Sequence, residues 1–447
     1  MSHIIQLSHA ALDECKRLEP CDAEIYTDDS FEMKVVFENT DFSVASSSHG
    51  AMLGLRVISN NRLGFVTTNT LEEKDVREKV REAQMIARLS PASPFHAIAP
   101  KQKHSAFQLG DERISAALPK DLLKWAELLV NESRRDPRVS LDRAEVTLHS
   151  TEQVVVNSNG VEAKIKQTMC SWFVMGMAKE GAEVTSFDYE GNSAVKWDDI
   201  EPRILETAQL FRESVLGSLG AASGKNYKGK VLFHPVAVGT LLAGLINHNV
   251  NARSQQDGMS KWAGKFGELV AHSDFNMTED PLNLSRPAHW SPFDREGVLT
   301  SKHEVIKSGH LNHTAHNMFS ATRGKAAPTG NATGGARSMS SIGLMGLSVG
   351  GGKTSENDLY DALQTGLVLK RFSGNSDPVS GQFSGVAKNS WWVEKGKRTS
   401  ALKEVMIAGN MFDLLKSIQL IGSKVHCIGG SFDSPYILID GVSVTAG

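Results

Sequence analysis

A short apolar run that leads into an amphipathic segment, in the middle of the chain, constrains the fold most strongly. The run Val231-Leu232-Phe233 is typical of a buried strand. Pro235 follows where a helix would begin, because the N–H that proline lacks is unpaired in the first helical turn anyway. Apolar residues then recur at helical spacing, at Val238, Leu241, Leu242 and Leu245. The sequence therefore predicts a buried strand followed directly by a helix over 236–248, with one face in the core.

The composition excludes several classes of protein. The chain has 447 residues, of which 40% are apolar, as expected of a globular protein with about two or three domains. Its formal net charge of -3 and its dispersed Lys and Arg residues argue against a nucleic acid partner. No apolar run approaches the length of a membrane span, so we expect no membrane partner either.

The cysteines and the N-terminus indicate a reducing compartment. Cys15, Cys21, Cys170 and Cys427 show no CxxC spacing, so we expect free thiols. The N-terminal segment lacks the basic start and apolar centre of a signal peptide. We therefore expect a cytoplasmic protein.

Two units of strands and helices are expected in the N-terminal half. The first, residues 1–95, has expected elements at 7–18 (helix), 23–28, 31–39, 51–58 and 62–68 (strands) and 71–89 (helix). Thr70 and Glu73 predict a capping box, and Asn60-Asn61 a tight turn, since asparagine tolerates positive φ. The second unit, residues 96–225, has expected elements at 119–134 (helix), 143–149, 152–157, 161–168, 169–178 and 183–190 (strands) and 201–218 (helix).

Residues 226–447 form a third expected domain. Many short apolar runs separated by Gly, Asn and Ser predict a β-rich domain, with helices at 236–248, 356–365 and 409–418. Strands followed by helices favour an α+β fold over a parallel α/β sheet. We therefore predict N-terminal α/β sandwich units with antiparallel sheets, followed by a β-rich C-terminal domain.

Short motifs follow one another in the C-terminal half. The first is PFDREG, the second is TGNA, the third is GQFSG with a downstream Glu-x-Gly, and AGN comes last. The residues concerned are Pro292, Phe293, Asp294, Glu296 and Gly297, then Gly330 and Asn331, then Gly381, Phe383, Ser384, Gly385 and Glu394. In this order they resemble the signatures of the TldD and TldE (PmbA) family, whose members act as a paired peptidase. The resemblance is dense over 228–447 and faint before it.

Asp294 and Glu296 have two interpretations from the residues alone. Carboxylates one residue apart can act as an acid and base pair. They can also accept hydrogen bonds from backbone N–H groups in a loop, and we favour this structural role.

The family resemblance gives the mid-chain helix its significance. In the TldD branch this helix carries an HExxxH zinc motif, in which imidazoles bind the ion and a carboxylate activates water. Here Ala243 and Gly244 occupy the His-Glu positions and only His248 remains. The third ligand of that branch is a cysteine near the C-terminus, and Cys427 lies too close to Pro435 to be its equivalent.

The resemblance therefore implies the TldE branch, a subunit with no catalytic residues and no metal or cofactor of its own. Zinc is expected in the partner subunit, an HExxxH paralogue that forms a heterodimer with this chain. The pair is expected to cleave unfolded or modified peptides in proteolysis and peptide maturation.

Two other hypotheses stay open. The segment with His303, His310, His313 and His316 supplies ligand types for a non-standard metal site, which would make the chain an active metallopeptidase. Against this, residues i, i+3 and i+6 of a helix do not share one face, so His310, His313 and His316 would not meet one ion there. The remaining hypothesis is a non-enzymatic homodimer that binds peptides.

Overall fold

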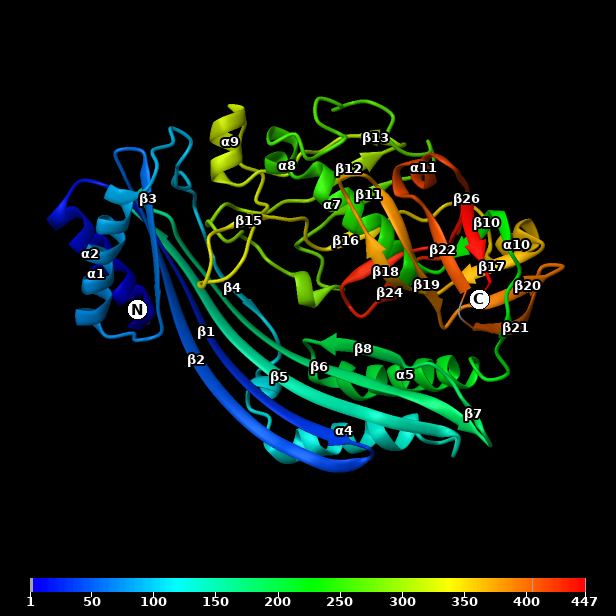
Figure 1. The fold of residues 1–447 in the computed structure, drawn as a ribbon. Coiled ribbons are helices and arrows are strands. Elements are labelled where there is room, and N and C mark those ends of the chain that lie inside the picture. The colour runs from blue at the N-terminus through cyan, green and yellow to red at the C-terminus, as the bar shows by residue number, and fades with distance from the viewer. Residues whose placement is uncertain (1–2, 404, 447) are drawn as a thin grey trace.

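The computed structural model describes residues 3–403 and 405–446. A long, curved and mainly antiparallel sheet from the N-terminal half holds the C-terminal domain within its curve (Figure 1). The expected α+β fold, with antiparallel sheets and a β-rich C-terminal domain, is confirmed.

Both expected N-terminal units contribute to one eight-stranded sheet. Its strand order is β3-β2-β1-β5-β6-β4, and β7 and β8 also pair with β6. The strands are β1 (Asp22–Glu38), β2 (Asp41–Ser59), β3 (Arg62–Thr68), β4 (Ala106–Leu109), β5 (Val139–Asn157), β6 (Glu162–Glu180), β7 (Glu183–Val184) and β8 (Asp188–Ala194). Strand β1 pairs antiparallel with β2 on one side and β5 on the other, so the sheet is continuous across the boundary between the units.

The long strands correct several expected boundaries. The pairs of short strands expected at 23–28 and 31–39, at 143–149 and 152–157, and at 161–168 and 169–178 are the single strands β1, β5 and β6. The polar residues at the expected breaks in β1 and β5 instead pair across the ladder, Asp29 with Glu152 and Ser30 with Thr151. A strand can continue through polar residues where the strands on both sides of it supply backbone hydrogen bonds.

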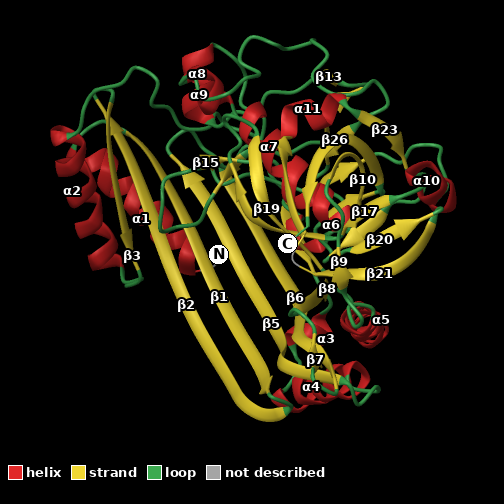
Figure 2. Cartoon of the chain, turned by 45° about the vertical axis from the view of Figure 1, so that its right-hand side comes forward, coloured by secondary structure: helices red, strands yellow, loops and turns green. Residues whose placement is uncertain are grey.

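Helices cover the two ends of this sheet (Figure 2). Near one end, α1 (His3–Leu18) and α2 (Glu73–Leu89) enclose a core with β1, β2 and β5. At the other end, α4 (Pro119–Ser133) and α5 (Trp197–Leu216) pack around Trp125 and Phe211, and α3 (Glu112–Ser115) precedes α4. All four cysteines are free, as expected.

Of the two local predictions in the first unit, the structure confirms the tight turn and contradicts the capping box. Asn60 and Asn61 have φ of 51° and 60°, which confirms the predicted turn. The capping box of Thr70 and Glu73 is wrong: α2 begins at Glu73, so Glu72 is the N-cap residue, and its side chain makes no capping hydrogen bond.

The C-terminal domain contains two larger sheets that enclose its core. The first has the order β18-β19-β22-β26-β10-β17-β20-β21-β9, with β23 on β26, and the second has the order β13-β12-β11-β16-β25-β24. The first sheet comprises β9 (Ala222–Ser223), β10 (Tyr227–Phe233), β17 (Gly366–Leu369), β18 (Arg371–Ser376), β19 (Gln382–Lys388), β20 (Trp391–Glu394), β21 (Lys397–Lys403), β22 (Val405–Asn410), β23 (Ile418–Ile421) and β26 (Ile437–Thr445). The second comprises β11 (Met277–Glu279), β12 (His303–Lys307), β13 (His310–Leu311), β16 (Leu347–Val349), β24 (His426–Ile428) and β25 (Phe432–Ser434). A separate pair joins β14 (Ala332–Thr333) to β15 (Ser341–Ile342).

Short helices complete this domain. They are α6 (Pro235–Val238), the π-helix η1 (Gly239–Ala243), α7 (Gly244–Val250), α8 (Ala252–Gln256), the 3-10 helix η2 (Pro287–His289), α9 (Met318–Gly324), α10 (Glu356–Leu363) and α11 (Met411–Lys416). Asn410 caps α11 by accepting a hydrogen bond from the Phe412 N–H, which explains why AGN precedes this helix. Across residues 3–403 and 405–446, none of the helices has the length and apolar character needed to cross a bilayer.

Candidate functional site

The mid-chain strand and helix form as the sequence predicts, with one irregular turn. Strand β10 leads into α6, whose N-cap residue His234 accepts a hydrogen bond at Nδ1 from the Val236 N–H, 3.2 Å away. The helix then widens into the π-turn η1 before α7. Its apolar face, which includes Leu241, Leu242 and Leu245, is buried in the C-terminal core.

The positions that would hold zinc on this helix do not fit the ion. Ala243 is buried and has no donor atom, and Gly244 is exposed, with no atom within 4 Å of where a Cβ would lie. His248 Nε2 lies 2.9 Å from the Met259 carbonyl oxygen and is occupied by that contact. Zinc in proteins needs at least three side-chain ligands, and this helix offers one. The residues of this helix therefore cannot hold a zinc ion by themselves.

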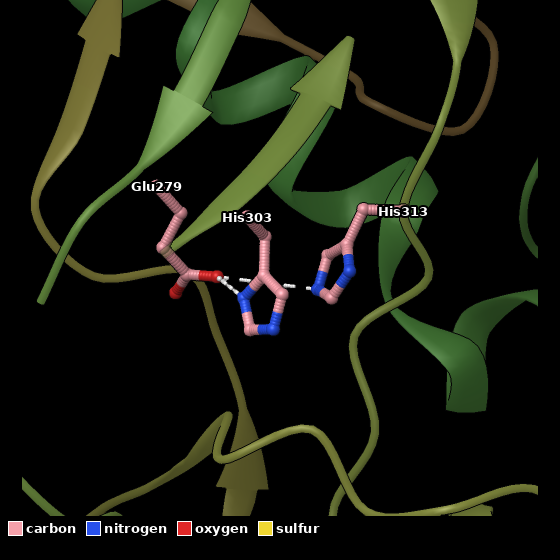
Figure 3. Close-up of side chains that lie close together, drawn as sticks. All are labelled: Glu279, His303 and His313. Carbon is pink, nitrogen blue, oxygen red and sulfur yellow. Dashed lines mark hydrogen bonds and ion pairs between the residues drawn. The ribbon is translucent and has the colours of Figure 1, made fainter. Parts of the chain in front are cut away.

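Another group of potential ligands lies on two strands of the second sheet and in the loop after β13 (Figure 3). Glu279 ends β11, His303 begins β12, and the two residues face each other in the antiparallel register. His303 Nδ1 lies 3.1 Å from Glu279 Oε2, and His313 Nε2 lies 3.9 Å from the same oxygen. The two imidazole rings stack with their centroids 4.2 Å apart. One potential ligand atom from each residue therefore lies within 4.8 Å of the others.

Neighbouring groups orient this cluster. Glu279 Oε1 accepts hydrogen bonds from Asn331 Nδ2 and the Met345 N–H, both at 2.7 Å, which leaves Oε2 for the histidines. His313 Nε2 lies 3.2 Å from Asn331 Oδ1. Burial lowers the pKa of His313 to about 4, and the nearby His303 contributes in the same direction. His313 is therefore a neutral imidazole at physiological pH.

The structure separates the histidines whose sequence spacing is regular. His310 is exposed on β13, with Nδ1 2.9 Å from the Ser308 carbonyl oxygen. His316 Nδ1 lies 3.2 Å from Ser320 Oγ at the start of α9. The segment that carries them is a short strand and a loop, so helical spacing does not apply. Of His310, His313 and His316, only His313 joins the cluster.

Asp294 and Glu296 lie on a tight turn and are both buried. Asp294 Oδ1 accepts from the N–H groups of Glu296 and Val298, at 2.9 and 3.0 Å, and Oδ2 accepts from the Ala332 N–H at 3.0 Å. Burial raises the pKa of Asp294 to about 8, with a further contribution from the charge of Glu296. These bonds hold the turn against β14, so the geometry supports a structural role rather than an acid and base pair.

Glu296 belongs to a charged network that joins the two halves of the protein. Its Oε1 accepts from Arg56 Nη1 on β2 at 2.8 Å, and Arg56 Nη2 donates to Glu24 on β1 at 2.7 Å. Arg295 Nη1 donates to the second oxygen of Glu24 at 3.1 Å. All four side chains are at least 95% buried. The PFDREG motif therefore docks the C-terminal domain onto the N-terminal sheet.

The other motifs allow close packing of the backbone. Gly330 has φ 76°, and a Cβ there would lie 2.7 Å from the Leu299 carbonyl oxygen. A Cβ on Gly385 would lie 2.4 Å from the Ser373 carbonyl oxygen on β18. Phe383 is buried, whereas Ser384 is exposed on β19 and Glu394 forms a surface ion pair with Lys225. Among the motif residues, Asn331 alone contacts the Glu279 cluster directly, through Glu279 and His313.

Comparison with known proteins assigns the family. Three domain models match in order along the chain: PmbA/TldA metallopeptidase domain 1 at 23–87, the central domain at 112–217 and the C-terminal domain at 225–446. The chain belongs to the PmbA/TldD metallopeptidase family. The resemblance drawn from the motifs is thereby confirmed, and it extends into the N-terminal half, where the motifs were faint.

Individual family members are similar over most of their length. A metalloprotease from Methanocaldococcus jannaschii is 23% identical and covers 90% of this chain, which spans 88% of that relative. Metalloprotease PmbA from Escherichia coli O157:H7 is 24% identical, with coverage of 87% and 83% respectively. TldE from Thermococcus kodakarensis is 20% identical in sequence to this chain. The match between its crystal structure and this structure covers 99% of this chain and 100% of the TldE chain, with a TM-score of 0.87. The chain thus has the fold of that family member.

Sequence reasoning missed two features of this PmbA/TldD chain. Glu279 lies 24 residues before His303, and only the register of β11 on β12 brings the two together. Glu24 and Arg56 lie in strands that carry no motif. Arg56 bonds Glu296 across 240 residues, and Glu24 bonds Arg295 across 271 residues. Buried charged residues in otherwise apolar stretches, such as Arg56 before Val57 and Ile58, were the available signal.

Proposed function

We propose that this chain is the non-catalytic subunit of a two-subunit metallopeptidase that cleaves unfolded or modified peptides. One observation carries the proposal: the helix on which the family's TldD branch holds zinc has Ala243 and Gly244 in place of the His-Glu pair, and its single histidine is bonded to a backbone carbonyl. The catalytic zinc would then lie in an HExxxH paralogue that forms a heterodimer with this chain.

In this proposal the subunit contributes surface for the substrate. Strand β3 pairs with β2 only over Leu53–Ser59, so the outer edge of β2 from Asp41 to Met52 has no neighbouring strand within the described part of the chain. Phe42 and Val44 on this segment are 55% and 43% exposed. An extended peptide can add to such an edge through backbone hydrogen bonds and place side chains against exposed apolar groups. A folded domain has no free strand to offer, so this mode of binding selects unfolded peptides.

Reconstitution tests the subunit role. Hydrolysis of an unfolded peptide would be measured for this chain alone, for the HExxxH paralogue alone and for the mixture, each with and without a chelator. We expect full activity only in the mixture and its loss with the chelator. Chelator-sensitive hydrolysis by this chain alone would overturn the proposal.

A pair of variants tests the peptide edge. We expect Val44→Lys to raise the KM of the mixture for an unfolded peptide, because a charge would replace an apolar contact. Leu89→Lys is the matched control, since Leu89 is 83% exposed at the end of α2, away from the edge of β2. An equal KM for both variants would exclude the β2 edge as the binding surface.

The alternative of an active metallopeptidase has one observation in its favour, the cluster of Glu279, His303 and His313. This hypothesis predicts hydrolysis by the chain alone that is lost in His313→Ala. The homodimer hypothesis predicts peptide binding without hydrolysis, and no change on addition of an HExxxH paralogue. The reconstitution experiment therefore separates all three.

A further inference from the structure

Glu279 is an unusual carboxylate for its surroundings. Its side chain is 1% exposed, and its ion-pair partners within residues 3–403 and 405–446 are His303 and His313, with no lysine or arginine among them. A buried carboxylate is costly unless a positive charge or several hydrogen bonds offset it. Asn331 and the Met345 N–H satisfy one oxygen, and the other faces the two imidazoles.

We propose that Glu279, His303 and His313 bind one divalent transition-metal ion that stabilises the C-terminal domain. Two imidazoles and a carboxylate are donors that zinc and neighbouring first-row metals accept in proteins. None of the three residues lies on the mid-chain helix. The proposal goes beyond the subunit role because it concerns an ion held by this chain itself.

The geometry lies close to that of a bound ion. With metal–ligand bonds of about 2.0–2.2 Å, donor atoms around zinc lie about 3.3 Å apart. Glu279 Oε2 lies 3.1 Å from His303 Nδ1 and 3.9 Å from His313 Nε2. Because a metal lies in the plane of each imidazole and the rings are stacked at 18°, one ring must tilt to complete the site. His303 has the room to do so, since its side chain is 21% exposed, and this exposure also gives the ion a path of entry.

Besides this tilt, metal binding needs a change of tautomer at each histidine. To bind through Nδ1, His303 carries its proton on Nε2, which lies 3.0 Å from Ser301 Oγ. To bind through Nε2, His313 carries its proton on Nδ1 and gives up its contact with Asn331 Oδ1. That oxygen keeps the hydrogen bond from Thr329 Oγ1 at 2.6 Å, so no buried acceptor loses its last partner.

The ion would connect parts of the domain that the sheet alone does not join. Glu279 and His303 lie on neighbouring strands, but His313 lies in the loop after β13, and Asn331 of the TGNA motif donates to Glu279. An ion that holds two strands and a loop of the folded chain together stabilises the fold. Its ligands are only 1%, 8% and 21% exposed, which leaves little access for a peptide. We therefore expect the ion to raise stability without conferring peptidase activity on this chain alone.

Metal content and thermal stability of the full chain test this proposal. The protein would be stripped with a chelator, dialysed against zinc and then against metal-free buffer, and analysed by mass spectrometry for zinc. We expect one zinc per chain and a higher melting temperature with zinc than without it. His303→Ala and His313→Ala should each weaken zinc binding by at least about 100-fold, because even residues that only support ligands cost up to this factor.

A histidine outside the cluster provides the control. His310→Ala removes an exposed imidazole from the same segment, and it should keep both the zinc and the thermal shift. Cobalt in place of zinc should give visible absorption bands that His303→Ala abolishes. His303→Ala is the variant to use if His313→Ala fails to fold, because His303 is the more exposed of the two residues. The proposal is overturned if wild type and His303→Ala bind equal zinc, or if neither binds any, and these results would leave the subunit role unaffected.

Discussion

Arg56 on β2 and Glu296 in the C-terminal domain form a buried ion pair, with Nη1 2.8 Å from Oε1. The same guanidinium donates to Glu24 on β1 at 2.7 Å. Glu296 also accepts hydrogen bonds from Ser340 Oγ and the Met318 N–H, each at 2.7 Å. Ion pairs and directional hydrogen bonds therefore specify the contact between the curved sheet and the C-terminal domain, in addition to the apolar area that it buries.

Replacement of Arg56 should destabilise the protein severely. Arg56→Met leaves the Glu296 carboxylate buried without its cation, and breaking a buried pair in this way costs about 3–5 kcal/mol. Arg143→Met is the matched control, because Arg143 is 37% exposed in its ion pairs, and it should cost less than about 1 kcal/mol. Urea denaturation measures both. Equal losses for the two variants would show that the buried network does not hold the domains together.

Features that depend on neighbouring residues could be predicted from the sequence. The buried run of β10, the helix start at Pro235 and the Asn60-Asn61 turn each follow from the chemistry of a few adjacent side chains. The long strands could not be predicted, because Ser30 and Thr151 look like a break until each is seen to pair with the other.

The candidate site likewise combines features set by adjacent residues with features set by residues far apart in the sequence. The absence of a His-Glu pair from the mid-chain helix was visible directly at Ala243 and Gly244. The cluster around His313 was visible only in part, because regular spacing drew attention to His310 and His316, whereas the partners in space are Glu279 and His303. Strand register decides which distant residues meet, and nothing near either residue encodes that register.

A side chain at Gly330 should not be tolerated. Its φ of 76° strains any other residue, and a Cβ would lie 2.7 Å from the Leu299 carbonyl oxygen, so we expect Gly330→Ala to cost more than about 2 kcal/mol. Gly258 has φ 73° with open space around it, and Gly258→Ala should cost only the strain of about 1 kcal/mol. Unfolding in urea compares them, and a smaller loss for Gly330→Ala than for Gly258→Ala would refute the steric argument.

The opposite result is expected at Gly244. Its φ is -62°, within the helical range, and no atom lies within 4 Å of the position that a Cβ would take. Because glycine in a helix loses more backbone entropy than alanine on folding, Gly244→Ala should stabilise the isolated chain by about 0.5–1 kcal/mol. Thermal denaturation of the isolated chain measures this gain. A loss of stability would mean that the π-turn before α7 needs the freedom of glycine.

Acid should weaken the packing of α1 on α2 through Glu14. Hydrogen bonds from Arg17 foremost, and from Arg81 and Arg77, lower the pKa of Glu14 from 4.5 to about 2. Because its folded pKa lies below its unfolded pKa, the stability from this group is complete above about pH 5 and is lost as the pH falls towards 2. Glu14→Gln should therefore melt at a lower temperature than wild type at pH 7, and this difference should shrink between pH 5 and pH 3. Melting temperatures over this range provide the measurement, with Glu78→Gln, an exposed residue on α2, as the control that should follow wild type throughout. A difference between Glu14→Gln and wild type that stays constant with pH would show that the arginines do not hold Glu14 ionised.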